Sequence, residues 1–87
     1  MVKKENKPFA KTLGELLKRG RYERGMTQAE FAWIIHMSEE GYGMIERGKR
    51  IPSALTLSSI HNKTGISIDR IFQEIDNIEK EKKLKED

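Results

Sequence analysis

The segment from Thr27 to Arg50 constrains the fold most, because it encodes two short helices separated by a tight turn. Thr27 and Glu30 have the spacing of a capping box, in which a hydroxyl and a carboxylate bind backbone N–H groups at a helix start. Ser38 offers a second N-cap eleven residues after the first. The residues in between leave room for one short helix and little more than a turn.

The remainder of the chain predicts three further helices and no strand, so the expected fold class is all-α. Thr12 and Glu15 repeat the capping-box spacing and predict the start of the first helix, which is expected to end near Gly25. The next three helices are expected over residues 28–36, 39–47 and 54–63, and the last from a Ser67 cap to beyond residue 72.

Composition limits the class of protein. At 87 residues the chain is expected to form one domain, and without cysteine its core must come from helix packing rather than from disulfides or thiolate-bound zinc. The absence of cysteine also fits a reducing cytosol, so a cytoplasmic location is expected. The longest apolar run, residues 31–35, is too short to span a membrane, and the N-terminus lacks the apolar core of a secretory signal.

Charge is distributed unevenly, although the net charge of +3 is only mildly basic. Residues 1–11 contain four lysines and one acid, and we expect them to form a basic flexible arm. Residues 74–87 contain six acids and four lysines and are expected to extend the last helix as a charged tail. The domain itself is therefore expected at residues 12–73, with any nucleic-acid surface in the arm or in the domain.

Many residues, in their order and spacing, resemble the phage-repressor (Cro and repressor-like, xenobiotic-response-element) helix-turn-helix family. The resemblance covers about residues 13–72 and is carried by Arg21, residues 25–32, Ser38, residues 45–50, Pro52 and residues 65–69. It implies a compact five-helix, lambda-repressor-like domain in which the second and third helices form the helix-turn-helix. It also implies a repressor-like transcriptional regulator that binds double-stranded DNA sequence-specifically through the third helix.

The resemblance assigns DNA contacts residue by residue. The positions that would face bases in the major groove are Glu39, Glu40, Gly43 and Met44. The positions that would contact phosphates are Gln28, Ser38, Arg47, Lys49 and Arg50. A glutamate can accept from cytosine N4, and Met44 can contact a thymine methyl. The alternative is that the two glutamates only favour the positive end of the helix dipole.

Two features of the scaffold can also be predicted. The resemblance implies an ion pair between Arg21 and Glu46 that ties the first helix to the end of the third. Gly20 lies on the inner face of the first helix, and we expect a neighbouring aromatic, Tyr22 or Trp33, to fill the space beside it. Trp33 itself is expected to be in the core or half-buried.

No constellation indicates catalysis. Neither His36 nor His61 has a cysteine or an Asp/Glu partner at the spacing of metal ligands, so no metal site is expected. The serines are explained as helix caps, and no glycine-rich loop has the spacing of a phosphate cradle. We therefore expect neither an enzyme nor a cofactor.

The last helix predicts a homodimer. Ile68, Ile71 and Phe72 can pack against the domain, whereas Ile75 and Ile78 continue the same apolar stripe beyond the part that a compact domain was expected to cover. These two isoleucines are the expected dimer interface.

A different class of function also fits the residues. The third helix is acidic and contains two glycines, so the fold can serve as a protein-interaction module, such as an antitoxin or anti-repressor, with weakened DNA readout. The affinity for duplex DNA at several salt concentrations separates the two hypotheses. A DNA reader is expected to lose affinity steeply as salt rises, whereas a protein-interaction module is expected to have little specific affinity for a duplex.

Overall fold

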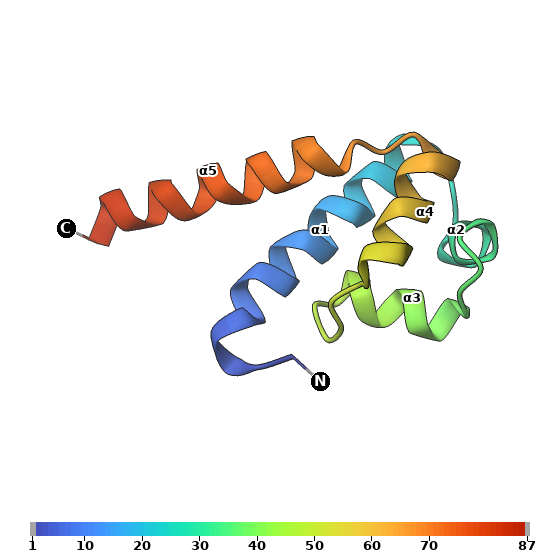
Figure 1. Cartoon of the computed structure of the whole chain (residues 1–87), viewed down its shortest axis with the longest axis horizontal. Coiled ribbons are helices and arrows are strands. Elements are labelled where there is room, and N and C mark those ends of the chain that lie inside the picture. Colours follow the sequence, from blue (N-terminus) through green and yellow to red (C-terminus); the bar gives the residue numbers. More distant parts are fainter. Residues whose placement is uncertain (1, 87) are drawn as a thin grey trace.

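The computed structural model describes residues 2–86, with side chains described through residue 84. It contains a short 3-10 helix, η1 (Lys4–Asn6), and five α-helices: α1 (Lys7–Glu23), α2 (Gln28–Ile34), α3 (Glu39–Glu46), α4 (Ala54–Thr64) and α5 (Ile68–Glu86). Helices α1 and α5 run side by side in opposite directions, and α2, α3 and α4 gather where α1 ends and α5 begins (Figure 1). The predicted all-α, five-helix architecture is confirmed. Within residues 2–86, no helix is both long and apolar enough to cross a membrane.

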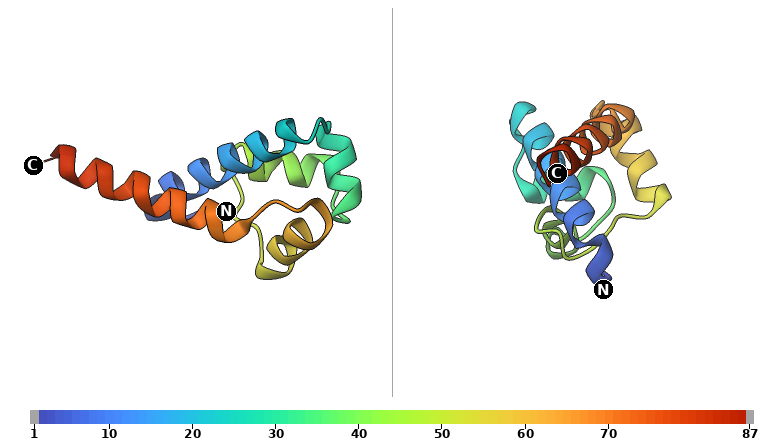
Figure 2. Two further views of the ribbon diagram at one scale, coloured as in Figure 1. Left: turned by 90° about the horizontal axis from the view of Figure 1, so that it is seen from above. Right: turned by 90° about the vertical axis from the view of Figure 1, so that its left-hand side faces the viewer.

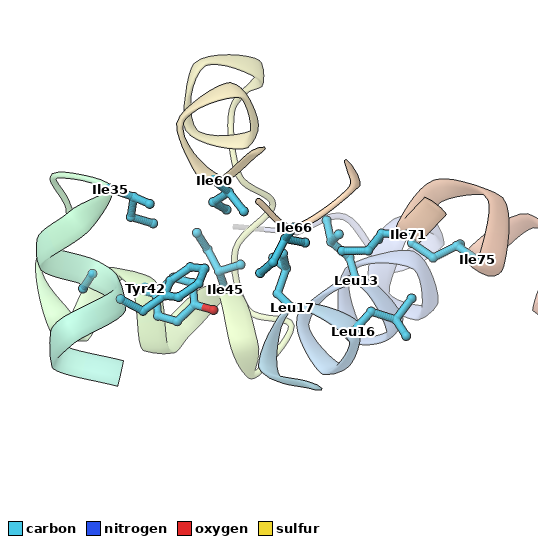
Figure 3. Close-up of a cluster of buried hydrophobic side chains, with 12 residues drawn as sticks. Leu13, Leu16, Leu17, Ile35, Tyr42, Ile45, Ile60, Ile66, Ile71 and Ile75 are labelled. Carbon is cyan, nitrogen blue, oxygen red and sulfur yellow. The ribbon is translucent and has the colours of Figure 1, made fainter. Parts of the chain in front are cut away.

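One cluster of buried apolar side chains joins all five helices (Figure 3). Its members are Leu13, Leu16, Leu17, Phe31, Ala32, Ile35, Tyr42, Ile45, Ile60, Ile66, Ile71 and Ile75. The rings of Phe31 and Tyr42 lie 4.7 Å apart between centroids and tie α2 to α3. Because each large side chain contributes about 1.5–3 kcal/mol when fully buried, this cluster is the main source of stability.

The helix ends follow the expected stop signals. Gly25, Gly48 and Gly65 have positive φ values of 66°, 75° and 78° and follow or close α1, α3 and α4. The turn between α2 and α3 uses a non-glycine residue, since His36 has φ 60°. The N–H of Met37 donates to the Ala32 carbonyl at 2.9 Å, which completes a Schellman-type stop at the predicted turn.

The predicted start of the first helix is wrong. Helix α1 begins at Lys7, so Thr12 lies inside it rather than capping it, and residues 7–11 are helical although they were expected in a flexible arm. Pro8 lies in the first turn, where its missing N–H costs no intrahelical bond. Proline at this position is the signal that indicates the true start.

The longer α1 changes the surroundings of α5. Ile75 is only 4% exposed and belongs to the core cluster, and Ile78 is half-buried. The expectation that Ile75 lies beyond the reach of the domain is therefore wrong, because α5 packs against α1 and Ile75 lies in the core that the helices share. The last turns of α5 project beyond the other helices (Figure 2).

The aromatic side chains do not fill the space beside Gly20. A Cβ atom on Gly20 would lie 2.9 Å from Cδ1 of Ile66, so an isoleucine from the α4–α5 connection occupies that space. Trp33 is 80% exposed and Tyr22 is 62% exposed, which corrects both expectations. Trp33 is two positions after the buried Phe31 and therefore points to the opposite side of α2.

Candidate nucleic-acid interface

Helices α2 and α3 begin at side-chain caps that the sequence predicts. The Glu30 N–H donates to Thr27 Oγ1 at 3.1 Å, and the Thr27 N–H donates to Glu30 Oε1 at 2.9 Å, so the capping box is complete. The Gly41 N–H donates to Ser38 Oγ at 3.0 Å at the start of α3. Each cap satisfies a backbone donor that has no intrahelical partner and so defines where its helix begins.

A buried ion pair holds the end of α3 against α1. Arg21 Nε donates to Glu46 Oε2 at 2.7 Å and Nη2 donates to Oε1 at 3.0 Å, a two-pronged arrangement that fixes distance and angle together. The two residues are 5% and 6% exposed. Arg21 Nη1 also donates to the Met26 carbonyl at 2.9 Å, so the same guanidinium holds the α1–α2 connection. The predicted scaffold pair is confirmed.

The charge state of this pair follows from its surroundings. Burial opposes ionisation of Glu46, but hydrogen bonds from Arg21 and Gln28 outweigh it and lower the pKa of the Glu46 carboxyl below its ordinary value. The hydrogen bond to Glu46 raises the pKa of Arg21. Burial raises the pKa of Tyr42, whose hydroxyl makes no hydrogen bond within the described residues. The pair is therefore ionised at neutral pH, beside a neutral tyrosine.

Gln28 has a scaffold contact that the sequence analysis did not assign to it. Its Nε2 donates to Glu46 Oε1 at 2.9 Å, so the first turn of α2 joins the network between α1 and α3. The amide nitrogen expected to bind a phosphate is already bonded, because three helices meet at the Glu46 carboxylate.

The exposed surface of α3 is narrower than expected. Glu39 and Glu40 are exposed in its first turn, and Met44 is half-buried one turn later. Gly43, expected to face the DNA bases, is buried instead. A Cβ atom there would lie 3.0 Å from Arg47 Nη1 and 3.6 Å from Gln28 Oε1, so these two side chains cover it. This part of the predicted site is corrected.

The segment after α3 is exposed and cationic. Arg47, Lys49 and Arg50 all have exposed side chains, as does Ser38 at the start of the helix. Arg50 reaches back along α3, since its Nη1 would lie 3.5 Å from a Cβ atom on Gly41. Arg47 and Lys49 therefore follow the buried end of α3, whereas Arg50 lies beside its first turn, and all three cations predicted to contact phosphates are exposed.

The sequence analysis did not assign a second group of cations to the site. Lys4, Lys7 and Lys11 lie on one side of η1 and the start of α1, and they line a cleft together with Arg47 and Lys49. We call this the basic cleft. Their spacing of three and four residues is the signal that could have placed them on one helical face.

Comparisons with known proteins agree with this geometry. A family model described as "Helix-turn-helix" matches residues 17–71. In Bacillus subtilis (strain 168), the SPbeta prophage-derived uncharacterized HTH-type transcriptional regulator YonR is 38% identical over 60 residues, which is 69% of this chain and 56% of the relative. The uncharacterized HTH-type transcriptional regulator YqaF is 36% identical over 61 residues, 70% of this chain and 80% of the relative. The matching region thus spans little more than half the length of YonR.

Solved structures show the same arrangement of helices. The clp gene regulator ClgR from Corynebacterium glutamicum superposes with a TM-score of 0.75 at 25% identity, covering 88% of this chain and 82% of that chain. A second structure of ClgR gives a TM-score of 0.72 at 26% identity, covering 78% and 87% of the two chains.

Proposed function

The chain belongs to the helix-turn-helix family, and we propose that it is a transcriptional regulator that binds double-stranded DNA sequence-specifically. The observation that carries this proposal is the combination of a rigidly held α3 with exposed cations directly after it. A helix whose capped start is exposed and whose end is locked by a buried ion pair can enter the major groove at a fixed angle. The protein acts by binding and by occupancy of its DNA site, as a cytoplasmic repressor-like regulator, and not as an enzyme.

The contacts with DNA divide into two kinds. Base readout is assigned to the exposed side chains of α3, namely Glu39, Glu40 and Met44. Phosphate contacts are assigned to Ser38, Arg47, Lys49 and Arg50. Gln28 belongs to the scaffold through its bond to Glu46, and only its remaining amide donor is free for a phosphate.

A homodimer on paired half-sites is part of the proposal. One α3 of eight residues offers few base contacts, and two copies about 34 Å apart double them. With Ile75 buried, the apolar side chains that α5 leaves for a partner are Phe72, the half-buried Ile78 and Leu84. The charged tail stays helical beside them, since Lys80 Nζ lies 3.1 Å from Asp76 Oδ2 at the favourable spacing of four residues.

The test is selection of bound duplexes from random-sequence DNA, followed by titration of the selected duplex at several salt concentrations. We expect a defined sequence to be enriched and the affinity to fall steeply with salt. Lys49→Ala should weaken binding equally on the selected and scrambled duplexes and reduce the salt slope by about one. Failure to enrich any sequence, with equal affinity for both duplexes, contradicts sequence-specific binding.

Two exposed features of α2 and α3 favour a second function. The exposed face of α3 presents two acidic side chains, which phosphates repel, and Trp33 is exposed on α2 nearby in sequence. Exposed carboxylates and an exposed tryptophan suit a protein partner, so the alternative is an interaction module of the antitoxin or anti-repressor kind. The same titration discriminates, because a protein-binding module has no steep salt-dependent affinity for duplex DNA.

A further inference from the structure

The basic cleft lies between the N-terminal segment and the end of α3. Its volume is about 820 Å³, and it is lined by Val2, Lys4, Lys7, Lys11, Met44, Arg47, Gly48 and Lys49. Five of these eight residues are cationic and none is acidic. The net charge of the whole chain is only +3, so positive charge is concentrated at the cleft.

Backbone contacts fix the walls of the cleft relative to α3. A Cβ atom on Gly48 would lie 2.8 Å from Cα of Lys11, so the turn after α3 touches the backbone of α1 directly. Gly48 also has a φ of 75°, which side-chain-bearing residues rarely adopt. The lysines are therefore held at a set offset from α3 instead of being carried on a flexible arm.

Among the residues whose side chains the structure describes, no acidic side chain pairs with a cation of the cleft. Among the residues that the structure describes, the ion pairs are Arg19–Glu74, Arg21–Glu46 and Asp76–Lys80, and none includes a residue of the cleft. Like charges gathered on one surface repel one another, and a polyanion relieves that repulsion. Such a surface therefore favours an anionic ligand with several charges.

The position of Met44 indicates which polyanion fits. Met44 lies in the lining of the cleft and is also one of the residues assigned to base readout. The cleft is thus continuous with the face of α3 that is proposed to enter the major groove. The anion next to that groove is the phosphate backbone of one strand of the same duplex.

We propose that the basic cleft binds the phosphodiester backbone beside the groove that α3 enters, so that Lys4, Lys7 and Lys11 extend the DNA contacts beyond the helix-turn-helix segment. This inference rests on the proposed function. It assigns the first residues of the chain to DNA binding in a fixed position, as part of α1 and the turn that precedes it.

The test compares two variants that remove the same charge. Lys7→Gln/Lys11→Gln removes two cations from the cleft, and Lys18→Gln/Lys83→Gln removes two exposed cations that lie outside it. With a duplex selected by the wild-type protein, we expect the cleft variant to reduce the salt slope by roughly two and to weaken binding at least about tenfold at physiological salt, with base preference unchanged. The control variant should keep the wild-type slope.

Phosphate ethylation interference on the same duplex locates the contacts. Ethylated phosphates beside the groove should interfere with wild-type binding and should lose that effect in the cleft variant. If thermal melting shows that the double variant is unfolded, Lys4→Gln carries the test, because it lies outside α1 and should reduce the slope by about one.

The outcomes separate the two proposals. A wild-type protein that selects no sequence and binds no duplex overturns the proposed function itself. A wild-type protein that binds its selected duplex, with a cleft variant whose slope and interference pattern are unchanged, overturns only the role of the basic cleft. Equal slope losses in the cleft variant and the control also overturn it, since they indicate a general charge effect.

Discussion

At the scale of single residues, Glu46 holds α3 in position against α1 and α2. Its carboxylate accepts hydrogen bonds from Arg21 of α1 and from Gln28 of α2, while its own backbone ends α3. A buried carboxylate with these donors is stable only while it is ionised, because protonation removes the charge that both donors are arranged to meet. The stability that this network gives to the position of α3 is therefore expected to depend on pH.

We predict that Glu46→Gln lowers the free energy of unfolding by about 3 kcal/mol at pH 7, because it leaves the Arg21 charge buried without its counterion. The pKa of Glu46 is lowered in the folded state, so its contribution is fully present above the unfolded-state pKa of about 4.3. That contribution is lost as the pH falls through the lower pKa of the folded protein. Denaturant unfolding at several pH values should therefore show the two proteins converging at acid pH. A constant difference at all pH values would contradict this linkage, and Glu79→Gln on α5 is the control.

At the scale of helices, α1 and α3 meet backbone to backbone. A Cβ atom on Gly14 would collide with the Ile45 carbonyl oxygen and would lie 2.5 Å from that of Glu46. The absence of a side chain at this one position lets the last turn of α3 approach α1 closely enough for Arg21 to reach Glu46. Gly20, two turns further along α1, meets only the flexible end of the Ile66 side chain.

We predict opposite outcomes for alanine at these two glycines. Gly14→Ala should destabilise the protein by at least about 2 kcal/mol, because two backbones must separate. Gly20→Ala should be close to neutral, because Ile66 can shift and alanine favours the helix by about 1 kcal/mol. Thermal or denaturant unfolding measures both variants. Equal effects on stability would mean that the α1–α3 contact is not the constraint inferred here.

The first turn of α3 has its own test. If Glu39 or Glu40 accepts from cytosine N4, replacing it by glutamine should lower discrimination at one base pair by roughly 1–3 kcal/mol. Repeating the duplex selection with each variant measures this. Tighter binding to every duplex with no change of preference would show that the carboxylate acts only through repulsion of phosphates.

At the scale of the whole molecule, the pairing of α1 with α5 decides which surfaces are free. The antiparallel contact extends toward the start of α1, where Phe9 and Phe72 have ring centroids 6.2 Å apart. Beyond it, Ile78 lines a cleft with Lys7, Pro8 and Lys82. The apolar stripe of α5 is therefore used mostly inside one molecule, and only its margins are available to a second copy.

We predict that Ile75→Asp and Ile78→Asp act differently. Ile75→Asp should unfold or strongly destabilise the monomer, because it puts a charge in the core. Ile78→Asp should remain folded and convert a dimer at tens of micromolar into a monomer. Sedimentation equilibrium together with thermal melting checks both outcomes. A monomeric wild type, or an Ile78→Asp variant that stays dimeric, would rule out an interface at Ile78.

The starts of α2 and α3 and the stop after α3 are predictable from sequence because the interactions that make them are local. The capping box at Thr27, the cap at Ser38 and the stop at Gly48 each depend on residues within a few positions of one another. The Arg21–Glu46 pair is not local, and it was predicted only through the family resemblance.

Tertiary packing determines which residues each helix face contacts. Ile75 is buried because α5 packs against α1, and Trp33 is exposed because of how α2 is turned; neither follows from local spacing. In the same way, lysines near the N-terminus and cations after α3 form one cleft only because Gly14 and Gly48 let two backbones come into contact. Local chemistry determines where helices start and stop, whereas the packing of distant segments determines which of their side chains meet.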